Sequence, residues 1–462
     1  MMQGDIARAL DRHAARLLRR HVLTGAMFGV VHDQQLAWSR GLGSPDRDRP
    51  LDAHTLSRVA SITKTFTATA VVQLRDVGKL RLDDPLVLHL PEFGAVRNPF
   101  GPIEDVTLRK LLCHHAGIVG EPPTGHWQSL HFPTREEVLA ALPRVEVVIP
   151  PGSAFKYSNL GYTLLGEVVE RASGRPVLDY LRSELLEPLG MADATFAPSA
   201  ADRPRNASGH LAHAFEDWAA PAPPSRTHGM AAAAELYASV HDLGHWLSLQ
   251  FRTDASERSG AQVLRGPSLA EMHRPQYVEP DWSLGYCLGW RANRRGDRIW
   301  HGHGGGLPGF RSQILFNVPE RVGVVVLIDG MGPADQIALD LAEAAAGLLA
   351  EAAPAPAPPA PVPTPDHVCR FLGLYRWVHF GELARVEYRG GRLVLVGGSA
   401  NPAPGSPPCP LEPTDVPNTF LVHGGRYAGE RLTFGQADDG RVTGFSAAGF
   451  AYTRLADPAG EP

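Results

Sequence analysis

A proline-rich segment near the C-terminus divides this chain of 462 residues into two unequal parts. Residues 351–366 read EAAPAPAPPAPVPTPD, and seven of the twelve residues from Pro354 to Pro365 are proline. Proline fixes φ and lacks a backbone N–H, so this segment cannot continue a helix and favours extended polyproline II structure. We therefore predict a domain at 1–350, a Pro/Ala-rich linker at 351–366 and a smaller domain at 367–462.

Composition excludes several classes of protein. The hydrophobic fraction of 44% is too high for a disordered chain, and the net charge of −5 leaves no basic excess for binding nucleic acid. No run of 18 apolar residues occurs, so no membrane-spanning helix is predicted. Residues 1–20 are amphipathic and lack the apolar stretch of a signal peptide, which favours a cytoplasmic location. The four cysteines form no C-x-x-C pair, so neither a disulfide framework nor a zinc ribbon is predicted.

The order of the apolar patterns predicts an α+β fold for the large domain. A strand pair is expected at 26–39, further strands at 311–318 and 322–329, helices between them and a last helix at 334–350. Strands at both ends of the domain imply a single sheet assembled from distant segments. After the linker, alternating apolar residues flank a Gly-Gly and an Asp-Gly turn, which predicts a small antiparallel β-barrel or sandwich.

A candidate nucleophile stands where a long apolar helix pattern begins. The motif Ser61-Ile62-Thr63-Lys64 opens the run SITKTFTATAVVQLRDVGKL. A spacing of three places Ser61 and Lys64 on one helical face, where the amine can accept or relay the hydroxyl proton. Free backbone N–H groups at a helix N-terminus also stabilise negative charge. Serine is also frequent there as a helix N-cap, and for the motif taken alone the cap is the more common role.

The motif S-x-x-K occurs twice, although only four of the 44 basic residues are lysines. The second copy, Ser153 to Lys156, follows Pro150-Pro151-Gly152 in a predicted loop. No helical turn would bring that serine and lysine together, so we interpret the second copy as coincidence.

Two further segments carry side chains suited to the same chemistry. Tyr157 and Asn159 lie two residues apart in an extended segment before a predicted helix, so both can face one cleft. The glycine-rich segment 300–310 precedes a predicted strand, and its glycines let backbone N–H groups approach a ligand closely. Taken alone, Tyr157 could be a core tyrosine and Asn159 a helix cap.

In their order along the chain, SITK, YSN and HGG resemble the motifs S-x-x-K, Y-x-N and K-T-G or H-x-G of the serine β-lactamase and penicillin-binding-protein superfamily. The similarity is greatest to the class C β-lactamase-like branch, with its esterases and D-amino-acid peptidases, and covers about residues 20–350. It implies an antiparallel sheet flanked by helices with an all-α subdomain. Residues 367–462 resemble the lipocalin-like β domain often appended to such enzymes.

The resemblance implies a role for each motif residue. Ser61 would attack a carbonyl and form an acyl-enzyme, with Lys64 and Tyr157 sharing the work of the general base. The substrate would be bound by Asn159 and by the segment His303, Gly304, Gly305 and Gly306. The backbone N–H groups of Ser61 and Gly306 would hold the oxyanion. No metal and no cofactor is implied.

One departure from the family pattern concerns the substrate. The middle residue of the third motif is Gly304 rather than threonine, whose hydroxyl helps to bind a substrate carboxylate in the family. We therefore expect a small ester, amide or peptide substrate, cleaved by an esterase or a D-amino-acid peptidase or amidase. A class C-like β-lactamase or a D-Ala-D-Ala carboxypeptidase is the alternative.

Neighbouring histidines allow further interpretations of the third motif. His301, two residues before His303, would take its place if the strand register were shifted. The pairs His114-His115 and His301-x-His303 lack the carboxylates of a motif such as H-E-x-x-H, so no metal site is predicted.

A catalytically inactive binding protein on the same fold is the second alternative function. The sequence leaves the oligomeric state undetermined.

Overall fold

The computed structural model describes residues 4–43, 50–212, 219–253, 262–352, 363–379, 381–397 and 406–455. The chain forms two compact units, Met1–Ala352 and Ala353–Pro462. Most of the predicted linker, residues 353–362, lies outside the described residues. Each unit is described by itself.

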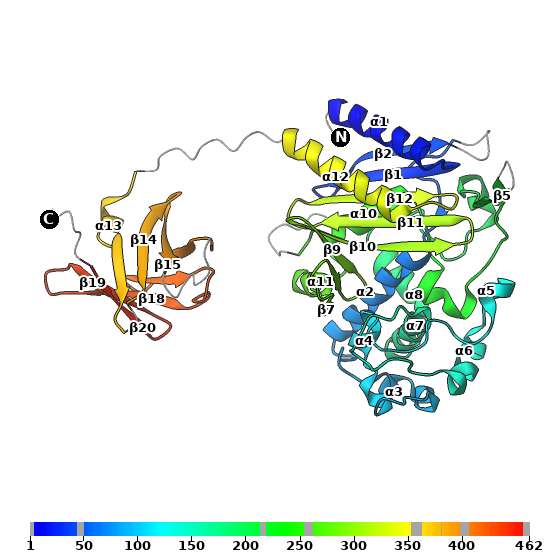
Figure 1. Cartoon of the computed structure of the whole chain (residues 1–462), viewed down its shortest axis with the longest axis horizontal. Coiled ribbons are helices and arrows are strands. Elements are labelled where there is room, and N and C mark those ends of the chain that lie inside the picture. The colour runs from blue at the N-terminus through cyan, green and yellow to red at the C-terminus, as the bar shows by residue number, and fades with distance from the viewer. Residues whose placement is uncertain are drawn as a thin grey trace. The chain divides into compact units, whose positions relative to one another are not determined.

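The large unit is built on an eight-stranded antiparallel sheet with the strand order β2-β1-β12-β11-β10-β9-β8-β7 (Figure 1). Its strands are β1 (Gly25–His32), β2 (Gln35–Gly43), β7 (Tyr277–Val278), β8 (Leu284–Tyr286), β9 (Arg291–Arg295), β10 (Arg298–Leu307), β11 (Phe310–Asn317) and β12 (Val322–Ile328). The N-terminal hairpin pairs directly with β12, because Ala26 lies opposite Ile328. This pairing of distant segments confirms the predicted α+β fold.

Helices cover both faces of the sheet, as the alternation of its side chains requires. In β1, Phe28 and Val30 pack into a core shared with helices α1 (Gly4–Arg20) and α12 (Ala334–Ala352). Met27 and Val31, from the opposite face of the same strand, pack into the larger core shared with α2 (Thr63–Asp76) and α10 (Val240–Gln250). In Figure 1, α1 and α12 accordingly lie on one side of the sheet and α2 on the other.

Short elements complete the helical side of the unit. The further helices are α3 (Leu86–His89), α4 (Leu108–Leu112), α5 (His126–Ser129), α6 (Arg135–Ala141), α7 (Asn159–Ser173), α8 (Val177–Leu181), α9 (Ala231–Ala234) and α11 (Gly266–His273). Two small strand pairs join β3 (Ser57–Arg58) to β6 (Tyr237–Ala238), and β4 (His210–Ala212) to β5 (Ala219–Pro221). No helix in the described ranges is long and apolar enough to span a membrane.

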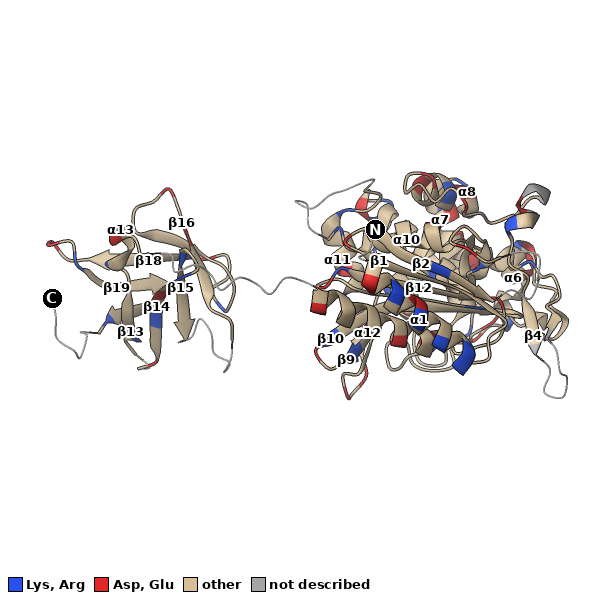
Figure 2. Ribbon diagram, turned by 90° about the horizontal axis from the view of Figure 1, so that it is seen from above, with Lys and Arg blue, Asp and Glu red and all other residues tan. Residues whose placement is uncertain are grey.

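The small unit is a closed antiparallel barrel in which each strand pairs with the next and β20 returns to β13. Its elements are α13 (Asp366–Cys369), β13 (Gly373–Trp377), β14 (Leu383–Arg389), β15 (Arg392–Gly397), β16 (Cys409–Pro413), β17 (Thr419–Val422), β18 (Arg431–Gln436), β19 (Val442–Ala447) and β20 (Phe450–Arg454). Aromatic side chains such as Tyr375, Phe434 and Tyr452 fill the interior, which confirms the predicted small β-barrel. Acidic and basic residues are interspersed on both units in Figure 2.

Asp329, directly after the last residue of β12, carries a buried carboxylate that makes the stability of the large unit depend on pH. Asp329 is fully buried, and neither of its carboxylate oxygens has a hydrogen-bond partner within the described ranges. Burial raises the pKa of Asp329 to about 6 from an ordinary value of 3.8. A raised pKa in the folded state means that ionisation of Asp329 opposes folding, so its contribution to stability is lost as the pH rises towards and through 6.

We expect Asp329→Asn to relieve this cost at alkaline pH. The variant's gain in the free energy of unfolding over the wild type should be about 1 kcal/mol larger at pH 8 than at pH 5, so the variant is relatively more stable at pH 8. Urea unfolding of both proteins at the two pH values measures the difference. The exposed Asp297, replaced in the same way, is the control. Equal shifts at both pH values for Asp329→Asn would rule out a raised pKa.

Candidate active site

Ser61 lies in a tight turn between β3 and α2, in the 3-10 helix η1 (Ala60–Ile62). The residue before it, Ala60, has a φ of +47°, a left-handed conformation that costs energy for any residue but glycine. The sheet holds this turn, because Ser312 Oγ donates to the carbonyl oxygen of Val59 at 2.8 Å. A Cβ on Gly305 would lie 2.1 Å from the same oxygen. The close approach of β10 to the turn therefore requires glycine at 305.

The Lys64 side chain is completely buried and makes three hydrogen bonds. Its Nζ lies 3.0 Å from Ser61 Oγ, 2.7 Å from Asn159 Oδ1 and 2.9 Å from the carbonyl oxygen of Ala233. Asn159 in turn donates from Nδ2 to Glu121 Oε1. A continuous chain of hydrogen bonds thus runs from the carboxylate of Glu121 through the amide and the amine to the serine hydroxyl.

Tyr157 lies beside this chain. The centroid of its ring is 5.1 Å from Lys64 Nζ and 4.3 Å from the centroid of the His114 ring. His114 Nδ1 accepts a hydrogen bond of 3.1 Å from the backbone N–H of Ser158. Burial, together with the charge of Lys64, lowers the pKa of His114 well below its ordinary value, so its ring is neutral. His114 therefore positions the segment that carries Tyr157 and Asn159.

The third motif lies on β10, opposite β11, with His303 facing Ile314 and Gly306 facing Arg311 in the register. Burial, and then the charge of Lys64, lowers the pKa of His303 to about 3, so the imidazole is neutral at physiological pH. Its Nδ1 donates to the carbonyl oxygen of Gly304 at 2.7 Å, which leaves Nε2 as an acceptor.

The motif residues meet at one cleft of about 530 Å³. Ser61, Tyr157, Asn159 and the segment 303–306 line it, and Lys64 lies beneath them. His301 is not among the lining residues, and its Nε2 is 2.9 Å from the carbonyl oxygen of His273. The other residues singled out in the sequence lie elsewhere. Ser153 Oγ donates to the carbonyl oxygen of Pro150, and His115 stacks on Tyr277 with ring centroids 3.8 Å apart.

Two arginines and a glutamine in the cleft had no motif to reveal them. Arg291 lies over the ring of Phe155, 5.0 Å from its centroid, and Arg311 reaches across Gly306, whose Cβ would meet its guanidinium at 1.9 Å. Among the described residues, no ion pair is formed by either arginine. Gln313 Oε1 occupies the space beside Gly304, 2.5 Å from where a Cβ would stand. A pairing of β10 with β11 in the correct register was the signal that could have placed Arg311 and Gln313 here.

Comparison with known proteins agrees with this arrangement of motifs. Residues 10–348 match the Beta-lactamase family. This chain belongs to the β-lactamase family. Protein flp of Staphylococcus aureus (strain N315) is 26% identical over 331 residues, which are 71% of this chain and 64% of flp. The D-alanyl-D-alanine-carboxypeptidase/endopeptidase AmpH of Escherichia coli (strain K12) is 29% identical over 253 residues, which are 54% of this chain and 63% of AmpH.

A solved structure resembles this member of the β-lactamase family over both of its units. The crystal structure of SurE is 27% identical, with a TM-score of 0.60, and the match covers 98% of this chain and all of that one. The chain spans just under two thirds of the length of flp and of AmpH, so the activities of those proteins are not transferred with the fold.

Proposed function

We propose that this protein is a serine hydrolase that cleaves an ester or an amide through an acyl-enzyme on Ser61, without a metal or a cofactor. The observation that carries the proposal is the contact of 3.0 Å between Ser61 Oγ and the Nζ of the fully buried Lys64. A serine hydroxyl becomes a nucleophile when a neighbouring group can take its proton.

The surroundings of Lys64 suit an amine that takes up a proton. Asn159 Oδ1 and the Ala233 carbonyl can only accept hydrogen bonds, so each requires an N–H from Nζ. The third direction faces the hydroxyl of Ser61, which can itself donate. Two directions of Nζ are therefore taken up by acceptors, and the third is the one along which a proton can pass between Ser61 and the amine. Arginine could not replace it, because a guanidinium does not give up its proton.

The reaction then follows in two stages. The Ser61 oxygen attacks the substrate carbonyl, its proton passes to Lys64 or Tyr157, and the oxyanion is held by the N–H groups of Ser61 and Gly306. The bond between the carbonyl carbon and the leaving group then breaks, and the leaving group receives the proton that the base took from Ser61. Water then attacks the acyl carbonyl and gives up a proton to the same base. The bond between the acyl carbon and Ser61 Oγ breaks, the base returns the proton to Ser61, and the acid is released.

The substrate class depends on two features of the cleft with opposite consequences. Gly304 lacks the threonine hydroxyl that binds a carboxylate in the family, and Gln313 fills its place. We therefore propose esters, amides or peptides with an N-terminal D-residue as substrates. The charges of Arg291 and Arg311 favour the second candidate, a carboxypeptidase or β-lactamase whose substrate carries a carboxylate, because a guanidinium binds that group with two hydrogen bonds.

A comparison of substrates distinguishes these candidates. Short-chain p-nitrophenyl esters and D-amino-acid amides should be hydrolysed faster than a chromogenic cephalosporin. For any substrate with a carboxylate, Arg311→Gln should raise KM about tenfold with little change in kcat, because a ground-state contact is lost. Neutral esters should be unaffected by this variant and serve as its control. A faster turnover of the cephalosporin by the wild type would reverse the assignment in favour of the second candidate.

A further inference from the structure

Two histidines and an aspartate gather on the large unit away from the cleft. His54 comes from the loop before β3, Asp193 from the segment after α8, and His241 from the first turn of α10. Each offers one ligand atom, and the three atoms lie within 4.8 Å of one another. His54 Nδ1 is 2.8 Å from Asp193 Oδ2, and the rings of His54 and His241 are 4.7 Å apart between centroids. None of the three lines the cleft.

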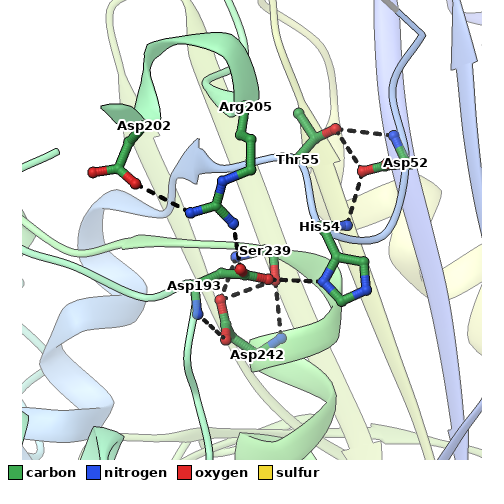
Figure 3. A network of polar contacts seen from close by, with 8 residues as sticks. All are labelled: Asp52, His54, Thr55, Asp193, Asp202, Arg205, Ser239 and Asp242. Atoms are coloured by element: carbon green, nitrogen blue, oxygen red, sulfur yellow. Dashed lines mark hydrogen bonds and ion pairs between the residues drawn. The ribbon is translucent and has the colours of Figure 1, made fainter. Parts of the chain in front are cut away.

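Side-chain hydrogen bonds hold the backbone near these residues, and Figure 3 shows those around His54 and Asp193 and those between Ser239 and Asp242. Asp52 Oδ1 accepts from the N–H of His54 and from Thr55 Oγ1, each at 2.9 Å, which fixes the turn that presents the imidazole. Asp242 Oδ1 accepts from the N–H of Asp193 at 3.2 Å. Asp242 also forms a capping box with Ser239 at the N-terminus of α10, directly beside His241. These bonds hold the backbone from which the three side chains project.

The carboxylate of Asp193 already has cationic and polar neighbours. Arg205 donates to Oδ1, while His54 and Ser239 contact Oδ2 at 2.8 and 3.3 Å. Arg205 is shared with Asp202, which lies 3.1 Å from it (Figure 3). A carboxylate has about four lone-pair directions, so Asp193 can keep the arginine on one oxygen and bind an ion with the other. The ion would take the place of the proton between His54 and Asp193.

We propose that His54, Asp193 and His241 form a structural binding site for a divalent transition-metal ion of the zinc type. Two imidazoles and one carboxylate are a donor set that Zn²⁺ accepts, whereas Mg²⁺ and Ca²⁺ prefer oxygen ligands only. Ligand atoms bound tetrahedrally at about 2.1 Å from zinc lie roughly 3.4 Å apart. On binding, the pair His54 Nδ1 and Asp193 Oδ2, now 2.8 Å apart, must therefore open by about 0.6 Å, and a pair as wide as 4.8 Å must close by about 1.4 Å. The side chain of His54, 57% exposed, is free to make that movement, and water completes the coordination.

The position of the site indicates what the ion would do. β3 follows His54 and leads into the turn of Ser61, while β6, its partner strand, precedes His241. An ion bound here would therefore join three distant chain segments next to the strand pair β3–β6, which leads into the turn of Ser61. Because it binds the folded chain and not the unfolded one, it would raise the melting temperature without taking part in hydrolysis.

To test the proposal, the full chain is first treated with a chelator and then titrated with Zn²⁺ in a calorimeter. The melting temperature is measured separately with and without Zn²⁺. The wild type should bind one more zinc equivalent than His54→Ala or His241→Ala. A hundredfold excess over Kd should raise its Tm by roughly 3 °C, and this rise should be lost in both variants. Mg²⁺ should have no such effect. His423→Ala is the matched control, since this exposed histidine pairs with the single carboxylate of Glu412 and should keep the wild-type stoichiometry.

Two results would overturn the proposal. The first is an equal zinc stoichiometry for the wild type and both variants, and the second is a wild-type Tm that Zn²⁺ does not raise. Circular dichroism and the Tm without metal establish that each variant is folded. His54 is more than half exposed, so its alanine variant keeps the test valid even if His241→Ala is unstable.

Discussion

Replacing Ser61 by alanine is expected to lower the hydrolysis of p-nitrophenyl esters by at least about 10³-fold and to abolish covalent labelling by a fluorophosphonate. The variant keeps the backbone N–H groups of residues 61 and 306 that we propose as oxyanion donors, but it has no atom that can form the acyl bond. Ser61 is only partly buried, and the described hydrogen bond of its side chain is the one from Lys64, so the variant should fold as the wild type does. Initial rates and gel fluorescence measure the two effects.

The chain supplies its own control for this substitution. Ser153 stands in the second S-x-x-K motif but is exposed and donates to the carbonyl oxygen of Pro150. Ser153→Ala should therefore keep wild-type rates and wild-type labelling. If the wild type itself takes up no label and cleaves none of the substrates, the hydrolase is refuted and the catalytically inactive binding protein is favoured in its place.

Replacing Lys64 by methionine should reduce kcat by about 10³-fold or more, while KM changes little. Methionine has a similar volume and fills the buried site, but it cannot take the proton of Ser61. The reactivity of the serine towards fluorophosphonate should fall with kcat, because both depend on the same proton transfer. Steady-state kinetics and the second-order labelling rate measure these effects. Lys156→Met, at the second S-x-x-K motif, is the control and should retain full activity.

The same measurements on Tyr157→Phe assign the base. If Lys64→Met keeps a kcat within about tenfold of the wild type while Tyr157→Phe loses 10³-fold, the tyrosine is the principal base and the lysine only positions it. If both variants lose activity to a similar extent, the two side chains act as one unit. A loss confined to Lys64→Met would make the amine the sole base.

Much of the fold, and the family to which the chain belongs, could be predicted from the sequence, because the sequence patterns that indicate them are local. Alternating apolar residues around short turns predict antiparallel hairpins, and both the hairpin β1–β2 and the C-terminal barrel are found. A helical spacing of three predicts that Ser61 and Lys64 share a face, and their atoms lie 3.0 Å apart. The order of the motifs indicates the β-lactamase family, which the family comparison confirms. The roles of the individual site residues remain predictions.

The tertiary structure alone decided which distant residues surround those motifs. The carbonyl oxygen of Ala233 comes from α9 and the carboxylate of Glu121 from a loop, and neither position carries a sequence signal for its contact with the hydrogen-bond chain of Lys64. Arg311 lies in the cleft only because β11 pairs with β10 in one particular register.

The group of His54, Asp193 and His241 depends on tertiary packing in the same way. More than a hundred residues lie between His54 and Asp193, and nearly fifty lie between Asp193 and His241. Neither spacing is typical of a metal motif. Local sequence determines the elements through backbone geometry and the periodicity of apolar residues. Contacts between distant elements depend on how whole surfaces pack together, and that information is spread over the entire chain.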